Sequence, residues 1–305
     1  MGRGEDSQNY PNHIKALIDL FSKSSNWSEN AEELLDFHKK YGTGKFARYR
    51  AFTWEEIRDT KNLRGIESPD PVELEDLIGY EVKRETIIEN TTQFLNDFPA
   101  NNMLLYGDRG TGKSSTVKAL LNKYYTEGLR IIEIPKEYLS DFPEIIRDLK
   151  NRPQKFIIFI DDLTFEDGET GYTALKAVLE GSVEAKPKNV LIYATSNRRH
   201  LVKEYFHERK GLGSSDPNEE IHASDSIQEK LSLADRFGIT VVFSSPSQEE
   251  YLEIIEGLVK NRNLKIDAED LERRALEWER SHNGRSARTA RQFVDYLEGN
   301  IGLHS

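Results

Sequence analysis

Eight residues at positions 107–114 combine three glycines, a lysine and a serine in the spacing G-x-x-x-x-G-K-S. An apolar run, residues 103–106, comes before them, and a helix-like run, residues 115–125, follows. This order predicts a turn whose backbone N–H groups surround a phosphate, with the positive end of a helix behind it. We expect Lys113 to reach the outer phosphates of a nucleoside triphosphate and the Ser114 hydroxyl to ligate Mg²⁺. The predicted nucleotide-binding residues of this segment are Gly107, Asp108, Arg109, Gly110, Thr111, Gly112, Lys113, Ser114 and Ser115.

Two adjacent carboxylates, Asp161 and Asp162, follow an apolar run at residues 156–160. A buried strand ending there would deliver both to its polar tip, 48 residues after Lys113 (161 minus 113). We expect Asp161 to hold Mg²⁺ directly or through water. We expect Asp162 to orient and polarise the water that attacks the outer phosphate. The alternative interpretation is a solvated acidic strand end.

Polar residues from three further segments are expected to complete the site. Asn197 follows the next apolar run and is expected to contact the γ-phosphate or the water, unless it only starts a turn. Arg236 precedes the last apolar run, where an arginine on the subunit surface could complete a neighbour's site. The alternative interpretation is that Arg236 forms a surface ion pair with Asp235. Arg285 and Arg288 begin the last predicted helix; one would face the phosphates, and the alternative is two ordinary surface arginines.

Short apolar runs rich in Ile, Val and Phe alternate with helix-like segments after residue 72. This pattern predicts an α/β fold with a five-stranded parallel sheet that is covered on both faces. Ligands of such sheets bind beyond the carboxyl ends of the strands, where the glycine-rich turn would lie. The predicted strands are residues 103–106, 130–134, 156–160, 190–194 and 239–243.

The chain divides into three predicted parts. Residues 1–70 show helical spacing followed by an irregular stretch, and a Ser-Pro-Asp-Pro sequence at 68–71 marks a boundary. Residues 71–246 form the α/β nucleotide-binding core. Residues 247–305 carry no strand signal, so they predict a small helical lid. Its expected helices are residues 248–261, 268–281 and 286–297.

Composition restricts the classes of protein to consider. Of the 305 residues, 37% are apolar and 31% are charged, which allows a packed core beneath a highly charged surface. No run approaches the roughly 20 apolar residues of a membrane helix, and no apolar signal region follows the N-terminus. The absence of cysteine excludes disulfides and thiolate metal sites. We therefore expect a cytoplasmic protein with no membrane association.

Basic and aromatic residues interleave over residues 45–54. Single-stranded nucleic acid binds such surfaces, because bases stack on rings and phosphates contact cations. The net charge of −11 disfavours non-specific nucleic-acid binding by the whole molecule, although not by a local patch. The alternative is an arm whose aromatic side chains pack on their own domain.

The order and spacing of these elements over residues 72–300 resemble the AAA+ ATPases. In this resemblance residues 107–114 correspond to Walker A and residues 156–162 to Walker B. Asn197 is similar to sensor 1, Arg236 to the arginine finger and Arg288 to sensor 2. Residues 76–80 resemble the segment that lines the adenine pocket, which adds Ile78 and Gly79 to the expected nucleotide-binding residues.

A closer likeness is to an uncharacterised bacterial AAA+ family known as a domain of unknown function. It rests on residues 102–115, 194–200, 229–238 and 284–293. It implies an ATP-binding core, a helical lid and ring assembly, and no known substrate.

The sequence departs from the AAA+ pattern at two places. Asp162 occupies a position where many AAA+ proteins carry Glu, which bears on the rate of turnover. The aromatic–x–Gly pore loop of unfoldases has no clear counterpart, Tyr138 being the nearest candidate.

An AAA+ ATPase is the function that the residues and the resemblance together predict. ATP and Mg²⁺ are the expected ligands, water attacks directly, and Arg236 acts across the interface of a nucleotide-dependent homo-oligomer. We expect hydrolysis to drive the remodelling or assembly of an unidentified protein partner. Two alternatives remain open: a DNA-associated loader that uses residues 45–54, and a slow nucleotide switch. A small-molecule kinase is a more distant alternative, since it requires an acceptor pocket.

Overall fold

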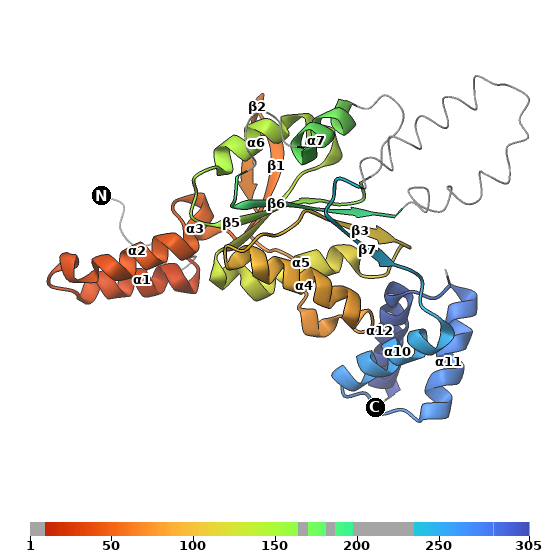
Figure 1. Cartoon of the computed structure of the whole chain (residues 1–305). Coiled ribbons are helices and arrows are strands. Elements are labelled where there is room, and N and C mark those ends of the chain that lie inside the picture. Colours follow the sequence, from red (N-terminus) through yellow and green to blue (C-terminus); the bar gives the residue numbers. More distant parts are fainter. Residues whose placement is uncertain (1–9, 164–169, 181–186, 198–234, 283, 305) are drawn as a thin grey trace, which may run out of the picture.

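The computed structural model describes residues 10–163, 170–180, 187–197, 235–282 and 284–304 (Figure 1). These residues contain a seven-stranded sheet with the strand order β2-β1-β4-β5-β6-β3-β7. Neighbouring strands are parallel except β1 and β2, which form an antiparallel pair at one edge. The strands are β1 (Ala51–Ile57), β2 (Thr60–Gly65), β3 (Met103–Gly107), β4 (Leu129–Glu133), β5 (Lys155–Ile160), β6 (Val190–Ser196) and β7 (Ile239–Phe243).

The five predicted strands are present as β3 to β7, and they are parallel as expected. The predicted count of five is wrong, because β1 and β2 extend the sheet. The predicted helical and irregular region over residues 1–70 therefore needs correction from residue 51 onward. In β1, Phe52 and Trp54 are buried, whereas Thr53 and Glu55 are partly exposed. A strand of this kind alternates and has no continuous apolar run, so a search for apolar runs misses it.

Helices cover both faces of the sheet (Figure 1). On one face α4 (Glu81–Leu95) and α5 (Lys113–Tyr124) pack through Ile87, Phe94, Val117 and Leu121. On the other face α6 (Phe142–Leu149) and α7 (Thr170–Glu180) pack through Phe142, Ile145 and Leu175. Each such buried side chain contributes about 1.5–3 kcal/mol. The two apolar layers hold the sheet rigid, so the carboxyl ends of its strands have fixed positions.

The N-terminal helices α1 (Asn12–Lys23), α2 (Ala31–Tyr41) and α3 (Lys45–Arg48) lie at one end of the molecule (Figure 1). Neither α1 nor α2 contains a fully buried side chain. Arg130 of β4, which is 1% exposed, connects them to the sheet. Its guanidinium donates hydrogen bonds to the backbone oxygens of Tyr41 (3.1 Å) and Phe46 (3.0 Å). The N-terminal helices are thus held to the core by a buried arginine that binds backbone oxygens.

Three helices follow the sheet, as predicted: α10 (Gln248–Asn261), α11 (Ala268–Ser281) and α12 (Ala287–His304). The last is longer than the expected 286–297. Ser247 begins α10 with a capping box, since its hydroxyl accepts from the Glu250 N–H while the Glu250 carboxylate accepts from the Ser247 N–H. The three helices enclose their own apolar core, which includes Tyr251, Ile255 and Phe293. They form a separate small domain beside the glycine-rich turn.

None of the helices in the part of the chain that the structure describes is both long enough and apolar enough to cross a membrane.

The burial of Trp54 predicts a large loss of stability on truncation. Its side chain is 3% exposed, and its indole N–H donates to the Asp141 carboxylate at 2.9 Å. We expect Trp54→Ala to lower the free energy of unfolding by about 3–5 kcal/mol. Trp27→Ala is the control, because Trp27 is 68% exposed, and it should cost no more than about 1 kcal/mol. Urea unfolding checks this, and equal midpoints for the two variants would show that β1 is not part of the folded core.

Candidate functional site

The glycine-rich turn leaves the carboxyl end of β3 and enters α5. Gly107, Gly110 and Gly112 have φ values of +136°, +76° and +90°, a region that favours glycine. Gly107 is also restricted by space, since a Cβ there would lie 2.0 Å from the backbone oxygen of Phe243 in the neighbouring strand β7. The Asp108 N–H donates to that same oxygen at 2.9 Å. The sequence of the turn is therefore dictated by its curvature and by its close packing against β7.

Lys113 lies inside this turn and is only 4% exposed. Its ammonium donates to the backbone oxygens of Gly107 (3.0 Å) and Asp108 (2.6 Å). Burial lowers the pKa of Lys113 to about 8, although the nearby carboxylates of Asp108, Asp161 and Asp162 oppose this shift. The protein holds a desolvated cation at the start of a helix, which is an arrangement that a bound anion would stabilise.

The two predicted metal ligands are in contact. The Ser114 hydroxyl, on α5, donates to Oδ1 of Asp161, beyond β5, at 2.6 Å. The same carboxylate oxygen accepts a hydrogen bond from the Thr195 hydroxyl of β6 at 2.6 Å. Thr195 was not among the predicted site residues, although it lies at the polar end of β6, two residues before Asn197. Asp161 thus connects the ends of two adjacent strands to the first turn of α5.

Asp162 has a φ of +52°, unusual for a residue other than glycine. Its N–H donates to the Thr195 hydroxyl at 2.9 Å and to Asp161 Oδ1 at 3.1 Å, which fixes the turn after β5. Its carboxylate accepts a hydrogen bond from the Asn197 side-chain amide at 2.8 Å. The structure therefore brings the predicted acid and the predicted polar sensor into direct contact.

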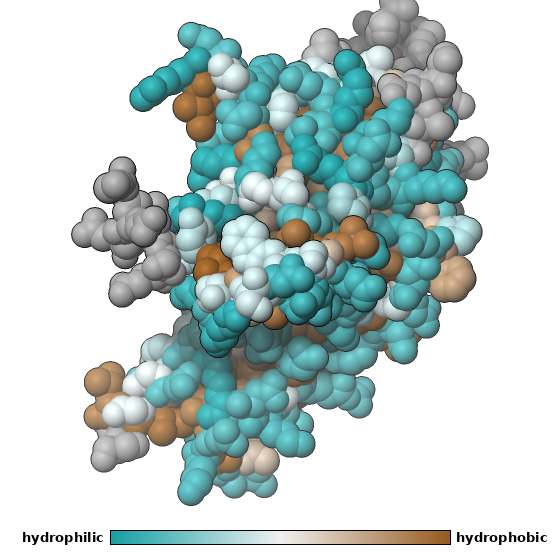
Figure 2. Space-filling view, turned by 90° about the vertical axis from the view of Figure 1, so that its left-hand side faces the viewer, coloured by the Kyte–Doolittle hydropathy of each residue, from teal (hydrophilic) through white to brown (hydrophobic). Residues whose placement is uncertain are grey.

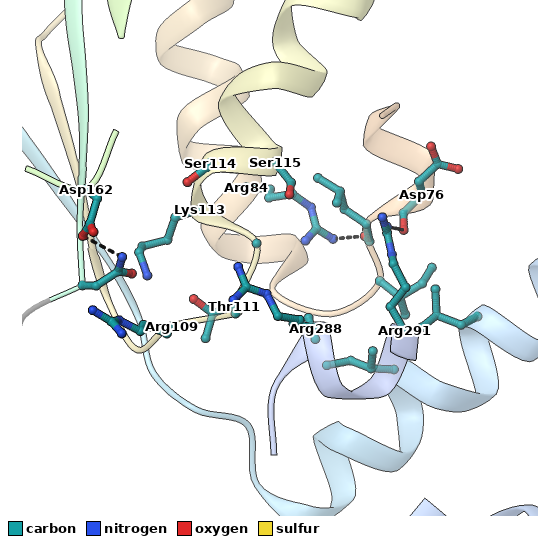
Figure 3. Close-up of a pocket in the computed structure, with 18 residues that line it drawn as sticks. Asp76, Arg84, Arg109, Thr111, Lys113, Ser114, Ser115, Asp162, Arg288 and Arg291 are labelled. Carbon is teal, nitrogen blue, oxygen red and sulfur yellow. Dashed lines mark hydrogen bonds between the residues drawn. The ribbon is translucent and has the colours of Figure 1, made fainter. Parts of the chain in front are cut away.

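Lys113, Ser114, Asp162 and Asn197 line one cavity of about 500 Å³ between the core and the helical lid. Asp161 and Thr195 lie behind this lining, where they hold Ser114 and Asp162 through hydrogen bonds. Figure 3 shows Lys113 and Arg109 at one end and Arg291 and Asp76 at the other, with Arg288 and Arg84 between them. Within the described part of the chain, five cationic side chains and two acids thus line the cavity. The lining residues are Asp76, Leu77, Ile78, Arg84, Arg109, Gly110, Thr111, Gly112, Lys113, Ser114, Ser115, Asp162, Asn197, Ile254, Leu258, Ala287, Arg288 and Arg291.

Arg84 and Arg291 are site residues that sequence reasoning missed. Arg84 is 7% exposed and donates to the Leu77 backbone oxygen and to Glu81. Arg291, one turn after Arg288 on α12, donates to the backbone oxygen of Asp76 at 3.4 Å. A charged residue within the imperfect apolar stripe of α4 was the only available signal for Arg84. The spacing of three between positions 288 and 291 was the signal for Arg291, since such residues share one helix face.

The far end of the cavity has an apolar wall. Leu77 and Ile78 contribute from the segment before α4, and Ile254 and Leu258 from α10. Gly79 does not line the cavity, but its φ is +78° and a Cβ there would lie 2.8 Å from the Ile254 side chain. Gly79 therefore lets this segment pack against the lid. A flat apolar group, such as a nucleobase, would fit against this wall.

The structure separates the two lid arginines. Arg288 lines the cavity, and its backbone N–H donates to the Gly110 oxygen at 2.9 Å. Arg285 is not among the lining residues, and its guanidinium pairs with Glu279 at 3.1 Å. Arg288 is consequently the lid arginine that lies beside the glycine-rich turn.

Arg236 lies outside the cavity of its own chain. Its guanidinium forms an ion pair with Glu180, the last residue of α7, with Nε 2.7 Å from the carboxylate. Most of the segment before it lies outside the described residues, as do residues 198–200 after Asn197.

Three aromatic side chains of the expected nucleic-acid stretch are buried in the core, and the pore-loop candidate is partly buried against it. Phe46, Phe52 and Trp54 are at most 3% exposed, so their rings are not available for bases to stack on. These three residues fit the alternative interpretation, in which the aromatic side chains pack on their own domain. Tyr138 packs against the same apolar layer, and the Lys61 ammonium lies 5.6 Å from the centre of its ring.

The residues present fit a magnesium nucleotide. Ser114 and Asp161 offer hydroxyl and carboxylate oxygens side by side, the ligands that Mg²⁺ prefers. Backbone amides of a left-handed turn, a buried ammonium and several guanidinium groups suit a polyphosphate. A parallel sheet with this turn after β3, acids after β5 and a helical lid defines a P-loop nucleotide-binding protein of the AAA+ class.

Residues 47–301 match the family described as "Protein of unknown function (DUF815)", and the chain belongs to that family. The matched range starts just before β1, so it includes the two edge strands. Among curated proteins, the proteasome-activating nucleotidase of Methanosarcina mazei is 30% identical over 120 residues, which cover 34% of this chain and 29% of that protein. The chaperone protein ClpB of Rickettsia conorii is 25% identical over 255 residues, 78% of this chain and 24% of that protein.

A solved structure of a RuvB variant from Thermotoga maritima is similar to this chain with a TM-score of 0.47 and 19% identity, covering 76% of this chain and 67% of that one. The chain spans less than a third of the length of the two curated relatives.

The position of Thr195 predicts that its hydroxyl stabilises the acidic turn. Thr195 is 1% exposed, and removing its hydroxyl takes one hydrogen bond from the Asp161 carboxylate and one from the Asp162 N–H. We expect Thr195→Val to lower the free energy of unfolding by about 1–3 kcal/mol and Thr195→Ser to stay close to the unsubstituted protein. Thr240→Val, on the exposed β7, is the control for a valine in a strand. Urea unfolding of all three variants measures this, and a Thr195→Val chain of unchanged stability would contradict it.

Proposed function

We propose that this protein binds and hydrolyses Mg-ATP as a nucleotide-dependent oligomer, and that hydrolysis drives the remodelling or assembly of a macromolecular partner. The observation that carries the proposal is the single cavity in which Lys113, Asp162, Asn197 and Arg288 meet. Their chain segments are far apart in sequence, and each was expected to act on the same triphosphate or on the water that attacks it. A glycine turn that served only to connect β3 to α5 would not collect them.

Binding would use the two ends of the cavity differently. The backbone amides of residues 110–114, the Lys113 ammonium and the Arg288 guanidinium would bind the phosphates. The apolar wall of Leu77, Ile78 and Ile254 would accept the base. Ser114 and Asp161 would hold Mg²⁺, which when bound neutralises phosphate charge and orients the phosphate oxygens.

Hydrolysis would use the acid beyond β5. Asp162 would orient the water and take its proton while the water oxygen bonds to the γ-phosphorus and the bond to the ADP oxygen breaks. The hydrogen bond from Asn197 holds the Asp162 carboxylate on the cavity side of the sheet. Lys113 and Arg288 would stabilise the charge that develops on the transferred group.

The location of Arg236 supports an oligomer. Its side chain is outside its own cavity, partly exposed at 22%, and held by Glu180 at the end of α7. An arginine fixed in this way could enter the site of an adjacent subunit and stabilise transition-state charge there. The proteasome-activating nucleotidase and the chaperone among the relatives support a macromolecular partner.

Two substitutions should separate binding from turnover. We expect Lys113→Ala to lose nucleotide binding, because it removes the cation that contacts the ground-state phosphates. We expect Arg236→Ala to bind within about threefold of the unsubstituted protein but to lose at least about a thousandfold in turnover. Arg280→Ala, an exposed arginine on α11, is the control and should change neither. The measurements are calorimetric titration with ATP and a steady-state ATPase assay.

Binding by Lys113→Ala at the original affinity would contradict the site, and full turnover by Arg236→Ala would contradict its action across an interface. The assay should be run with and without single-stranded DNA, alongside a mass measurement with and without nucleotide. Stimulation by DNA that falls with salt would favour a DNA-associated loader. Tight binding with almost no turnover would favour a slow switch.

The lowered pKa of Lys113 predicts how nucleotide affinity depends on pH. With a pKa of about 8 in the nucleotide-free protein, the ammonium loses its proton as pH rises through that value. A bound triphosphate favours the charged form, so binding takes up a proton and becomes weaker at about pH 9 than at about pH 7. Lys113→Arg keeps its charge over this range and should lose that dependence. Calorimetric affinities at the two pH values test this; equal affinity for the unsubstituted protein would exclude a titrating Lys113.

A further inference from the structure

A second cavity, also of about 500 Å³, lies where the N-terminal helices meet the edge of the sheet. It shares no lining residue with the first cavity. The residues that give it chemical character are Tyr10, His13, Arg48, Tyr49, Arg50 and Tyr125. Three of these belong to the basic and aromatic stretch at residues 45–54 that the proposed function leaves unused.

Arg48 and Arg50 provide two available cations. Among the described residues neither forms an ion pair with a carboxylate; the Arg48 guanidinium lies 5.3 Å from the centre of the Tyr49 ring and that of Arg50 5.3 Å from the centre of the Tyr125 ring. Such stacking leaves the N–H groups at the edge of each guanidinium free to bind an anion. Two ordinary solvated arginines on the surface would not both line one cavity, each beside an aromatic ring that holds it in place.

The charges of the remaining groups leave the cavity positive. Arg130 lines it, and its guanidinium stays charged at neutral pH because burial lowers its pKa only to about 10. His13 contacts the Ala47 backbone oxygen at 2.7 Å, and burial lowers its pKa, so it is neutral and donates that hydrogen bond. Among the residues that the structure describes, Glu67 is the single acid in the lining. Three guanidinium groups against one carboxylate make a basic cavity on a chain whose net charge is −11.

The aromatic side is held in place by packing. The Tyr49 ring lies directly over Gly65 of β2, where a Cβ would come within 2.2 Å of it. Tyr49 also packs edge-on against the buried Phe52, with 6.4 Å between the ring centres. Tyr125 follows the last residue of α5 and lies under the Arg50 guanidinium. Rings fixed in this way hold the Arg48 and Arg50 guanidinium groups in position at the cavity.

We propose that this second cavity binds a small ligand carrying both an aromatic ring and a phosphate, of the nucleoside phosphate class. Arg48 and Arg50 bind the phosphate through paired N–H groups, and the base contacts the aromatic part of the lining, which includes Tyr10. The size supports one such ligand, since a cavity of about 500 Å³ is within the range of small-molecule sites. This site does not depend on the proposed function of the first.

The observations favour a small ligand over a polymer or a protein. A single strand of nucleic acid needs a row of exposed rings, and three of the aromatic side chains in this stretch, Phe46, Phe52 and Trp54, are buried. Figure 2 views the side on which α1 and α2 lie; it is mostly hydrophilic, with apolar residues in small separate groups. A compact basic and aromatic cavity on such a face suits a phosphorylated small molecule.

The test is a calorimetric titration of the Lys113→Ala chain with each common ribonucleoside monophosphate, with inorganic phosphate and with adenosine. The Lys113→Ala substitution is used because it is expected to abolish nucleotide binding in the first cavity, so that only the second cavity contributes to the measured heat. We expect saturable binding of at least one monophosphate that is tighter than that of phosphate or adenosine alone and that weakens with salt. Adding Arg48→Gln and Arg50→Gln should weaken it at least about tenfold. Adding Arg280→Gln should leave it unchanged, and matching urea midpoints confirm that all variants fold.

The proposal is overturned if no monophosphate binds, or if binding survives loss of both arginines. It is also overturned if an oligothymidylate binds through the two arginines while no monophosphate does, because the cavity would then serve a nucleic acid. Absence of ATP binding at the phosphate loop of the unsubstituted chain would refute the proposed function and leave this result standing.

Discussion

A cation buried inside a turn of glycines is the constraint on which the rest of the site depends. The Lys113 ammonium is almost fully removed from water and is held by backbone oxygens of its own turn. Burying a charge without a counter-charge is costly, so a structure retains one only where a partner compensates. The carboxylates of Asp161 and Asp162 supply part of that compensation. A bound polyphosphate would supply the remainder, which explains why the cavity faces this turn.

The sheet determines where those compensating groups lie. β5 and β6 are parallel neighbours, so their polar tips, Asp161, Asp162, Thr195 and Asn197, come together at one edge. The lid reaches the same edge because the Arg288 N–H donates to Gly110. Core and lid therefore contact the same turn, and a ligand there would contact both. Such an arrangement allows occupancy of the cavity to alter the position of the lid.

Much of this could be predicted from the sequence, for identifiable reasons. The central strands are continuous apolar runs because both faces of the sheet are covered, and the glycine spacing is dictated by backbone conformation. β1 and β2 were missed because neither is a continuous apolar run: buried and less buried residues alternate in β1, and β2 has only Leu63 buried. Arg84 and Arg291 were missed because only tertiary packing brings them to the cavity. Arg285 and Arg288 could not be separated, since the choice depends on how α12 is rotated against the turn.

Binding of a magnesium nucleoside triphosphate at the glycine-rich turn is the step on which the proposed function depends. Its most direct test is a calorimetric titration of the Arg48→Gln, Arg50→Gln chain with ATP and Mg²⁺, in which the second cavity cannot contribute. We expect the titration with ATP to give saturable heat that corresponds to one nucleotide bound per chain. No heat from ATP or from any other triphosphate, with a chain that unfolds at the normal urea concentration, would contradict it.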